Sequence, residues 1–273
     1  MLNRRELLLS AAAGVVTFAL PAAAEARTLS EIKKSGVIRI SVPQDFPPFG
    51  YVRSDLKLQG YDICMAEYIA KELGVKPDLI RTTSANRIPY MQSGRADIVV
   101  STLGKNPARA KVVDFSIAYG PCVLAVYGPA SAKVSKPSDL KGHTVGCTRG
   151  SNEDIILTKL NPAGARIIRY EDNSVTAQAY LSNQCELVAL IDTIAMTLNK
   201  KAAPNRKLEK KFGLRLSPNY IGIMKGDTAM KAEIDRIVTK AFKSGGMDKW
   251  SREFLGGPIP KDMLKQEPGD IKW

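Results

Sequence analysis

Arg109 lies in a stretch whose residue types suit the binding of a carboxylate. The β-branched run at residues 98–100 predicts a buried strand of a parallel sheet. Polar and glycine residues follow this run: Ser101, Thr102 and Gly104. Pro107 favours the first position of a helix, which would place Arg109 in the first helical turn. The strand end and the helix start would then bring hydroxyls, backbone N–H groups and a guanidinium together, as carboxylate binding requires. The alternative is a solvated arginine beside ordinary turn residues.

A second polar cluster follows the predicted strand at residues 144–147. The strand ends at Thr148, and Ser151 and Asn152 come immediately after Gly150, before an acidic pair. This order is typical of an N-capped helix start, which also favours anions. Ser151 or Asn152 can cap its own helix and contact a ligand as well.

Asp192 stands at the carboxyl end of another predicted strand, residues 186–191. Two roles remain open for this carboxylate. It can face a ligand, or it can cap the helix predicted over residues 193–199, a position that aspartate often occupies.

The elements that must position these residues alternate along the chain. Helices are predicted over residues 29–36, 63–73, 174–181 and 228–244, and further strands over residues 37–42, 77–81, 122–127 and 166–170. Two prolines make residues 44–49 a loop at the carboxyl end of the first strand, where open α/β sheets bind ligands. The alternation predicts an α/β fold, and no internal repeat is present.

The stretch around Arg109 resembles the signature of periplasmic solute-binding proteins that serve polar amino acid ABC importers. A segment like SGKxDxIxxxxxxTxER…VDFSxPY recurs in that family. The matching positions are Ser93, Gly94, Asp97, Arg109, residues 113–116 and Tyr119. Gly104 departs from the usual Ser or Thr, and residues 106–108 depart from Thr-Pro-Glu. The resemblance therefore implies carboxylate capture by Arg109 with one hydroxyl contact fewer.

The resemblance covers roughly residues 29–256 and implies the type 2 periplasmic-binding-protein fold. This is a two-lobed α/β fold with mixed, mostly parallel sheets flanked by helices and two hinge crossings. The expected first lobe comprises residues 27–120 and 218–256, and the second comprises residues 121–217. The tail, residues 257–273, is assigned no role.

By the same resemblance, Phe46 stacks on the ligand and Asp192 pairs with its α-ammonium. Ser84 stands where the family usually has a second large aromatic residue. Gln44 and Asp45 can accept hydrogen bonds from a polar or cationic ligand side chain. The family further implies a monomeric receptor without a cofactor, which delivers an amino acid with a polar side chain to a membrane permease.

Two other kinds of function are open on this fold. One is a lyase like the periplasmic cyclohexadienyl dehydratases, which needs a positioned acid. No carboxylate except Asp45 and Asp192 follows a predicted strand obviously, and a single histidine, His143, without a GxSxG motif argues against hydrolysis. The other is a sensory or accessory binding module, against which the presence of both Arg109 and Asp192 argues.

Residues 1–26 read as a secretory signal: a basic start, an apolar stretch and small residues near Ala24 and Ala26. The apolar stretch is shorter than the roughly 20 residues of a membrane anchor, which is the alternative. Arg4 and Arg5 resemble a twin-arginine signal, although Asn3 replaces the usual Ser or Thr. The sequence therefore predicts export to the periplasm, with the twin-arginine route open.

The chain has 273 residues and a net charge of +13, which removal of residues 1–26 leaves unchanged. The basic residues are dispersed and accompany no nucleic-acid motif, so we expect no nucleic acid partner. The four cysteines are Cys64, Cys122, Cys147 and Cys185. Their spacing does not fit a structural zinc site, and we expect mostly buried free thiols.

Overall fold

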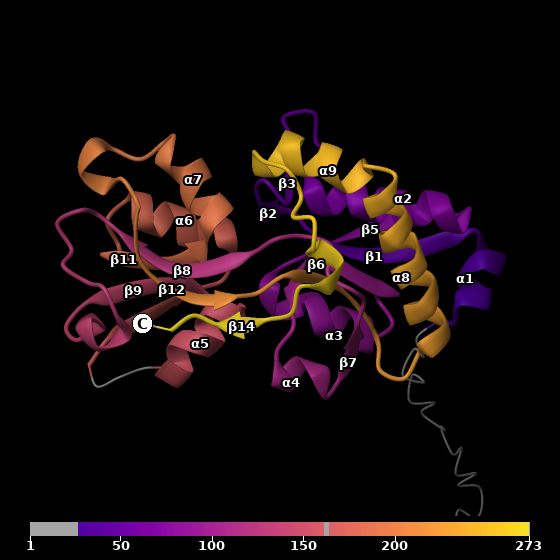
Figure 1. Ribbon diagram of the computed structural model, residues 1–273, viewed down its shortest axis with the longest axis horizontal. Coiled ribbons are helices and arrows are strands. Elements are labelled where there is room, and N and C mark those ends of the chain that lie inside the picture. Colours follow the sequence, from indigo (N-terminus) through magenta and orange to yellow (C-terminus); the bar gives the residue numbers. More distant parts are fainter. Residues whose placement is uncertain (1–26, 161–163, 273) are drawn as a thin grey trace, which may run out of the picture.

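The computed structural model describes residues 27–160 and 164–272. The predicted signal peptide with its twin-arginine pair lies outside the described residues. The chain forms two α/β halves, each built around its own sheet (Figure 1). The predicted two-lobed α/β fold is confirmed.

The first half contains a five-stranded sheet in the order β5-β1-β6-β13-β7. Its strands are β1 (Val37–Pro43), β5 (Lys76–Thr82), β6 (Ile98–Gly104), β7 (Val113–Phe115) and β13 (Asn219–Met224). Its helices are α1 (Leu29–Ser35), α2 (Tyr61–Leu73), α3 (Arg87–Gln92), α4 (Pro107–Ala110), α8 (Thr228–Lys243) and α9 (Gly246–Trp250). Helices α2 and α3 pack against β1 and β6, with α2 above and α3 below the sheet in Figure 1.

The second half contains a six-stranded sheet in the order β10-β9-β11-β8-β12-β14. Its strands are β8 (Val123–Gly128), β9 (Thr144–Thr148), β10 (Arg166–Tyr170), β11 (Leu187–Ile191), β12 (Glu209–Leu216) and β14 (Gly269–Asp270). Its helices are α5 (Asn152–Leu160), α6 (Asn173–Leu181) and α7 (Asp192–Asn199). Short 3-10 turns lie at Ser84–Asn86, Pro137–Leu140, Pro204–Arg206 and Met263–Lys265, and a π-helical turn at Ser251–Leu255.

Local sequence signals account for several of these boundaries. Thr28 and Glu31 form a capping box at the start of α1, and Gly36 ends that helix in the left-handed conformation at φ 68°. Pro107 occupies the first turn of α4 as predicted. The prediction of a pure loop over residues 44–49 needs a correction. Asp45–Phe46 forms the two-residue strand β2, which pairs with β3 (Gly50–Val52), and β3 in turn pairs with β4 (Leu58–Gln59).

The sheets are mixed, but parallel pairing does not predominate. In each of the two larger sheets two strand pairs are parallel and the remaining pairs are antiparallel. The reason lies in the crossings between the halves. The chain enters the second half through β8 and leaves it through the neighbouring β12, so these two strands must run in opposite directions.

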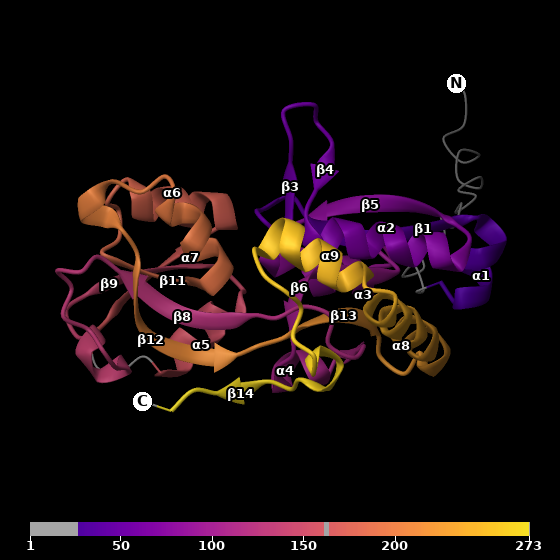
Figure 2. The same cartoon turned by 45° about the horizontal axis from the view of Figure 1, so that its top comes forward.

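The two crossing segments lie side by side and are hydrogen-bonded to each other. Asn219 N donates to Gly120 O, and Ser217 N donates to Cys122 O, both at 2.8 Å. The tail adds a third contact between the halves. Lys105 of the first half pairs with Glu267 at 2.8 Å, and β14 pairs with β12 of the second half (Figure 2).

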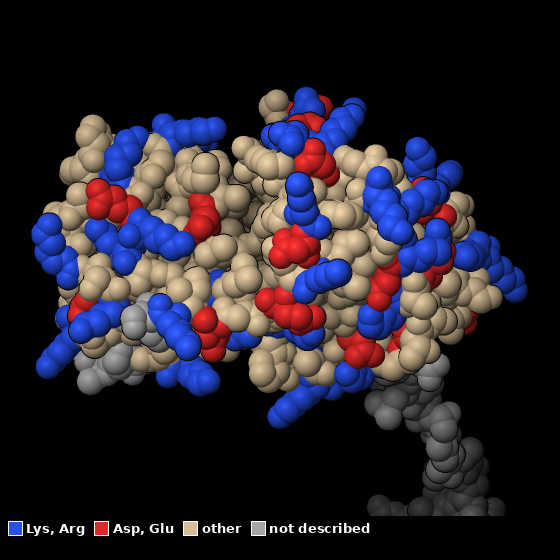
Figure 3. Space-filling model, viewed as in Figure 1, with Lys and Arg blue, Asp and Glu red and all other residues tan. Residues whose placement is uncertain are grey.

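The surface and the thiols follow the sequence-based expectations. On the face shown in Figure 3, Lys and Arg side chains are spread over both halves and interleaved with Asp and Glu. All four cysteines are free, and all but the half-buried Cys64 are buried. Within the described residues, no helix combines the length and the apolar character needed to span a membrane.

Candidate functional site

A narrow cavity of about 20 Å³ lies between the two halves. Eight of the ten residues that the sequence predicts for the site line it: Phe46, Ser84, Thr102, Gly104, Arg109, Thr148, Ser151 and Asn152. Ser101 and Asp192 do not line it. Six further polar or thiol residues of the lining were not predicted from the sequence: Arg87, Cys122, Glu153, Asn173, Ser217 and Asn219.

Arg109 reaches across the boundary between the halves. Its Nη1 donates to Gly104 O at 2.8 Å in the first half, and its Nη2 donates to Gly150 O at 3.0 Å in the second. Asn106 fixes the helix start by accepting a hydrogen bond from Arg109 N at 2.9 Å. Burial, and to a smaller degree the nearby positive charge of Arg87, lower the pKa of Arg109 to about 9. The guanidinium therefore stays charged at neutral pH in a place where an anion would stabilise it.

Arg87 is a second buried guanidinium in the same cavity. It is 5% exposed, and it donates from Nε to Ser101 Oγ at 3.1 Å and from Nη1 to Thr102 O at 3.4 Å. Burial lowers its pKa, while the nearby charge of Asp62 opposes that shift. Residues 84–97 resemble the family segment WxxLIPALxSGKxD, in which a leucine stands at the position of Arg87. A charge at an apolar position was the signal that could have found it.

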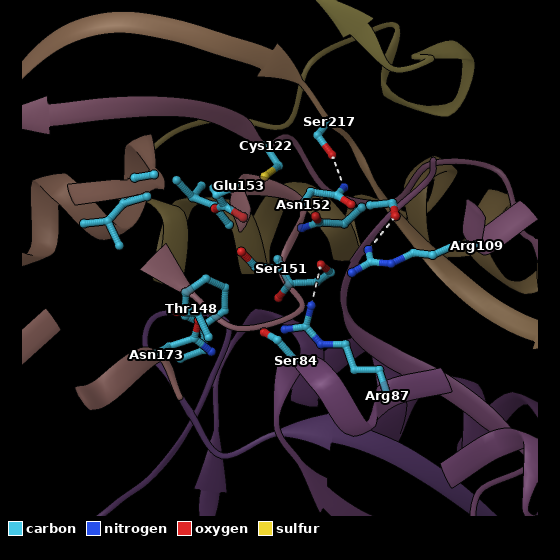
Figure 4. A pocket seen from close by; sticks show the side chains of 17 residues that line it. Ser84, Arg87, Arg109, Cys122, Thr148, Ser151, Asn152, Glu153, Asn173 and Ser217 are labelled. Atoms are coloured by element: carbon cyan, nitrogen blue, oxygen red, sulfur yellow. Dashed lines mark hydrogen bonds between the residues drawn. The ribbon is translucent and has the colours of Figure 1, made fainter. Parts of the chain in front are cut away.

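Glu153 brings a carboxylate to the opposite wall of the cavity. It lies in the first turn of α5, is 7% exposed and faces the two arginines across the empty space (Figure 4). Burial raises its pKa, although Ser151 and the two arginines counteract this. From the sequence, Asp45 and Asp192 were the only carboxylates expected at strand ends, and Glu153 reaches the cavity from a helix start instead.

Ser101 and Thr102 have internal partners for their hydroxyl groups. Ser101 Oγ accepts from Arg87, whereas Thr102 Oγ1 donates to Asp62 Oδ2 at 2.6 Å. These hydroxyls therefore position Arg87 and the β6 backbone in this structure. Thr148 Oγ1 is likewise hydrogen-bonded to Thr176 Oγ1 at 2.8 Å. Ser151 Oγ caps α5 by accepting from Asp154 N at 3.1 Å.

Asp192 lies outside the cavity. It is the first residue of α7, whose N-cap is Ile191, so it does not cap the helix as the alternative reading expected. Its carboxylate accepts a hydrogen bond from the Tyr127 hydroxyl and lies 3.5 Å from Lys210 Nζ. With 39% of its side chain exposed, the carboxylate faces a mixture of protein and solvent.

The loop that carries Phe46 contacts the second half directly. Phe46 lines the cavity and stacks on Phe49, which is fully buried, with ring centroids 5.6 Å apart. Asp45 Oδ2 accepts from Asn173 N at 2.7 Å, at the start of α6. Asp45 is thus engaged by the protein, and Gln44 does not line the cavity. The expectation that both would accept hydrogen bonds from a ligand gains no support.

Two amide side chains in the cavity lack partners. Asn219 is fully buried, and neither its Nδ2 nor its Oδ1 has a hydrogen-bond partner among the described residues. Asn173 Nδ2 is also buried without one. Buried polar groups are normally hydrogen-bonded, so these atoms suit a polar ligand. Within the described residues no cluster of His, Cys, Asp and Glu could hold a metal ion.

Gly104 allows the two halves to approach closely. A Cβ on Gly104 would lie 2.2 Å from Asn152 Nδ2 and 2.3 Å from Ser217 Oγ. Asn152 is held there because its Nδ2 donates to Ser217 Oγ at 3.1 Å and its Oδ1 accepts from Asn106 Nδ2 at 2.8 Å. The Asn152 amide therefore occupies the space of the side chain that the family carries at position 104.

We expect Gly104→Ser to weaken ligand binding because the new side chain pushes α5 away from β6. Overpacking a buried contact costs about 1–3 kcal/mol, or roughly 5- to 150-fold in affinity. Asn152→Thr shortens the opposing side chain, so the double variant should recover most of the loss. Calorimetric titration of the wild type, the two single variants and the double variant gives the coupling energy between positions 104 and 152. A Gly104→Ser protein that binds like the wild type would contradict this account of the contact.

Comparison with known proteins places this chain in a family. The family model for bacterial extracellular solute-binding proteins, family 3, matches residues 38–257. The chain is 29% identical over 271 residues to the glutamate/aspartate import solute-binding protein of Salmonella typhimurium, covering 94% of this chain and 89% of that protein.

Two solved structures are similar in fold. The cysteine-binding protein of Campylobacter jejuni has a TM-score of 0.77 and 28% identity, over 90% of this chain and 99% of that one. The ancestral amino acid-binding protein AncCDT-1, a precursor of cyclohexadienyl dehydratase, has a TM-score of 0.76 and 27% identity, over 83% of this chain and 99% of that one. The match over most of the chain shows that this protein belongs to the bacterial extracellular solute-binding proteins, family 3.

Proposed function

We propose that the protein captures an L-α-amino acid in the cavity between its halves and delivers it to the permease of an ABC importer. The ligand's side chain carries a hydrogen-bond acceptor, either a carboxylate or a carboxamide. The observation that carries this proposal is the presence of two buried guanidinium groups, those of Arg87 and Arg109, in one cavity.

Each arginine can offer donors to a separate acceptor group of the ligand. Arg109 uses Nη1 and Nη2 once each for backbone carbonyls, and its Nε has no partner among the described residues. Arg87 uses Nε and Nη1, which leaves its Nη2 available. Charge-assisted hydrogen bonds from arginine suit carboxylate and amide oxygens. We assign the α-carboxylate to Arg109 and the side-chain acceptor to Arg87.

The sequence left both polar and cationic ligand side chains open, and the assignment to Arg87 favours the polar ones. A cationic side chain near Arg87 would meet a like charge at close range in a buried site, which is unfavourable. The relatives do not decide the question, because one is named for glutamate and aspartate and another for cysteine.

The expected lobes, residues 27–120 with 218–256 and residues 121–217, would open and close about the two crossings. Contacts that would form on closure include Arg109 with Gly150 O, Asp45 with Asn173 N and Asn106 with Asn152. A ligand that touches both lobes stabilises this closed form, because only closure makes all of its contacts.

We also propose that residues 1–26 are a cleaved signal peptide and that the mature protein works as a periplasmic monomer without a cofactor. The related sequence named above is an import protein, which supports this location and a permease partner. Intact-mass analysis of periplasmic material should find a chain that begins near residue 25 or 27.

Binding without catalysis is the function we propose. The Salmonella relative is named a solute-binding protein, and the ancestral structural neighbour is itself named an amino acid-binding protein. Because that neighbour precedes a dehydratase and Glu153 places an acid in the cavity, prephenate and arogenate belong in the ligand screen, with product analysis of any hit.

A thermal-shift screen of the L-amino acids tests the proposal. We expect glutamate, aspartate, glutamine or asparagine to raise the melting temperature by roughly 5–10 °C at 100-fold excess over Kd, since such binding adds about 2.7 kcal/mol. Lysine and arginine should give little shift. A response restricted to cationic or aliphatic amino acids would overturn the side-chain assignment, and no response to any amino acid would overturn the function.

A further inference from the structure

Glu153 is a buried carboxylate without an ion-pair partner. It is 7% exposed, and none of the ion pairs among the described residues involves it. Arg87 and Arg109 act on it electrostatically without forming an ion pair with it, and a hydrogen bond from Ser151 also favours its charged form. A buried carboxylate without a direct cationic partner is costly. A cationic group of a bound ligand would relieve this cost.

The neighbouring acid, Asp154, is already engaged. Its Oδ1 accepts from Arg169 Nε at 2.7 Å, and its Oδ2 accepts from Gly150 N at 3.0 Å. Ser151 Oγ accepts from Asp154 N, which fixes the first turn of α5. Of the two acids at this helix start, only Glu153 lines the cavity. The rigid turn therefore presents one carboxylate to the ligand and directs the other away.

The carboxylate expected to bind an ammonium also has its own partners. Asp192 accepts from the Tyr127 hydroxyl, lies near Lys210, and does not line the cavity. To reach a ligand it would have to give up both contacts. Glu153 would give up no ion pair.

We propose that Glu153, and not Asp192, accepts the α-ammonium of the bound amino acid. This inference rests on the amino acid function proposed above. Arg109 approaches from the first half and Glu153 from the second, so the α-carboxylate and the α-ammonium of one ligand connect the two walls (Figure 4). Glu153 is then a specificity-determining residue that separates amino acids from plain carboxylates.

The test compares Glu153→Gln with Asp192→Asn by calorimetric titration. Each protein is titrated with the amino acid that binds the wild type and with the compound that lacks only its amino group. For L-glutamate that compound is glutarate, and for L-glutamine it is glutaramate. We expect Glu153→Gln to lose at least about 30-fold in affinity for the amino acid, as when one partner of a buried charge pair is neutralised. The deaminated compound should bind this variant as well as or better than the wild type.

The control variant should behave differently. Asp192→Asn should change both affinities by less than about threefold. Glu153→Asp keeps the charge on a shorter side chain and should restore part of the amino acid affinity. Circular dichroism and unliganded melting temperature establish that each variant is folded.

Two results would overturn the inference while leaving the proposed function intact. One is an equal loss for both compounds in Glu153→Gln, which would indicate a purely structural carboxylate. The other is an amino-acid-selective loss in Asp192→Asn alone, which would return the ammonium to Asp192. Failure of the wild type to bind any amino acid would overturn the proposed function, and this inference with it.

Discussion

Arg109→Ala should lower the affinity for the amino acid by at least roughly 10- to 150-fold. The loss of charge-assisted hydrogen bonds to the α-carboxylate alone accounts for about 1.5–3 kcal/mol. The structure adds a second cost, because Gly104 O and Gly150 O would both lose their guanidinium donor when the halves approach. Calorimetric titration of the purified protein measures the loss directly.

Arg109→Lys should also weaken binding substantially, although the charge is kept. An ammonium cannot reproduce the planar fork that reaches two carbonyls and a carboxylate. Arg236→Lys, on the exposed face of α8, is the matched control and should leave the affinity unchanged. Wild-type affinity in Arg109→Lys would refute the assignment of the α-carboxylate to Arg109.

The contribution of Asp62 to the free energy of unfolding should decrease as the pH rises from about 4 to 6. Asp62 is fully buried, and it accepts hydrogen bonds from Thr102 Oγ1 at 2.6 Å and the Tyr119 hydroxyl at 2.7 Å. Burial raises its pKa from 3.8 to about 6. Because the folded pKa lies above the unfolded one, the stabilising contribution is complete below pH 4 and is lost as the pH passes 6. The change amounts to about 3 kcal/mol.

Asp62→Asn should remove this pH dependence. Urea unfolding at several pH values gives the free energy of unfolding of both proteins. The value for Asp62→Asn minus the value for the wild type should rise by about 3 kcal/mol between pH 4 and 7, because only the wild type loses the Asp62 contribution. Asp114→Asn is a control of opposite sign, because hydrogen bonding to Lys225 lowers the pKa of that half-buried carboxyl. Its contribution is lost as the pH falls. If the free energies of unfolding of Asp62→Asn and the wild type differ by the same amount at every pH, Asp62 has the same pKa in the folded and unfolded protein and the prediction is wrong.

The elements of the fold could be predicted because their signals are local. Gly36 and Gly74 end helices in the left-handed conformation, and Pro107 begins one. β10 has the predicted bounds, and α2 begins two residues before the predicted helix. Hydrophobic periodicity and capping act within a few residues of the chain, so a sequence carries them directly.

The partners of the polar side chains could not be predicted in the same way. Asp192 and Tyr127 are 65 residues apart, and their hydrogen bond depends on the pairing of β11 with β8. Arg87 meets the hydroxyl of Ser101 through the packing of α3 on β6. Whether a carboxylate at a strand end faces a ligand or a tyrosine is decided by such long-range packing.

The sequence by itself determined the α/β character of the chain, most element positions and the arginine at the centre of the predicted site. The tertiary structure alone decided that Glu153 and Arg87 share the cavity with Arg109, while Asp192 lies outside it. The physical reason is that burial and electrostatic environment arise only when two halves approach. At the start of α5, sequence alone shows two acids suited to a helix N-terminus. The folding of the second half, in which Arg169 and Gly150 engage Asp154, leaves Glu153 as the acid that lines the cavity beside the two guanidinium groups.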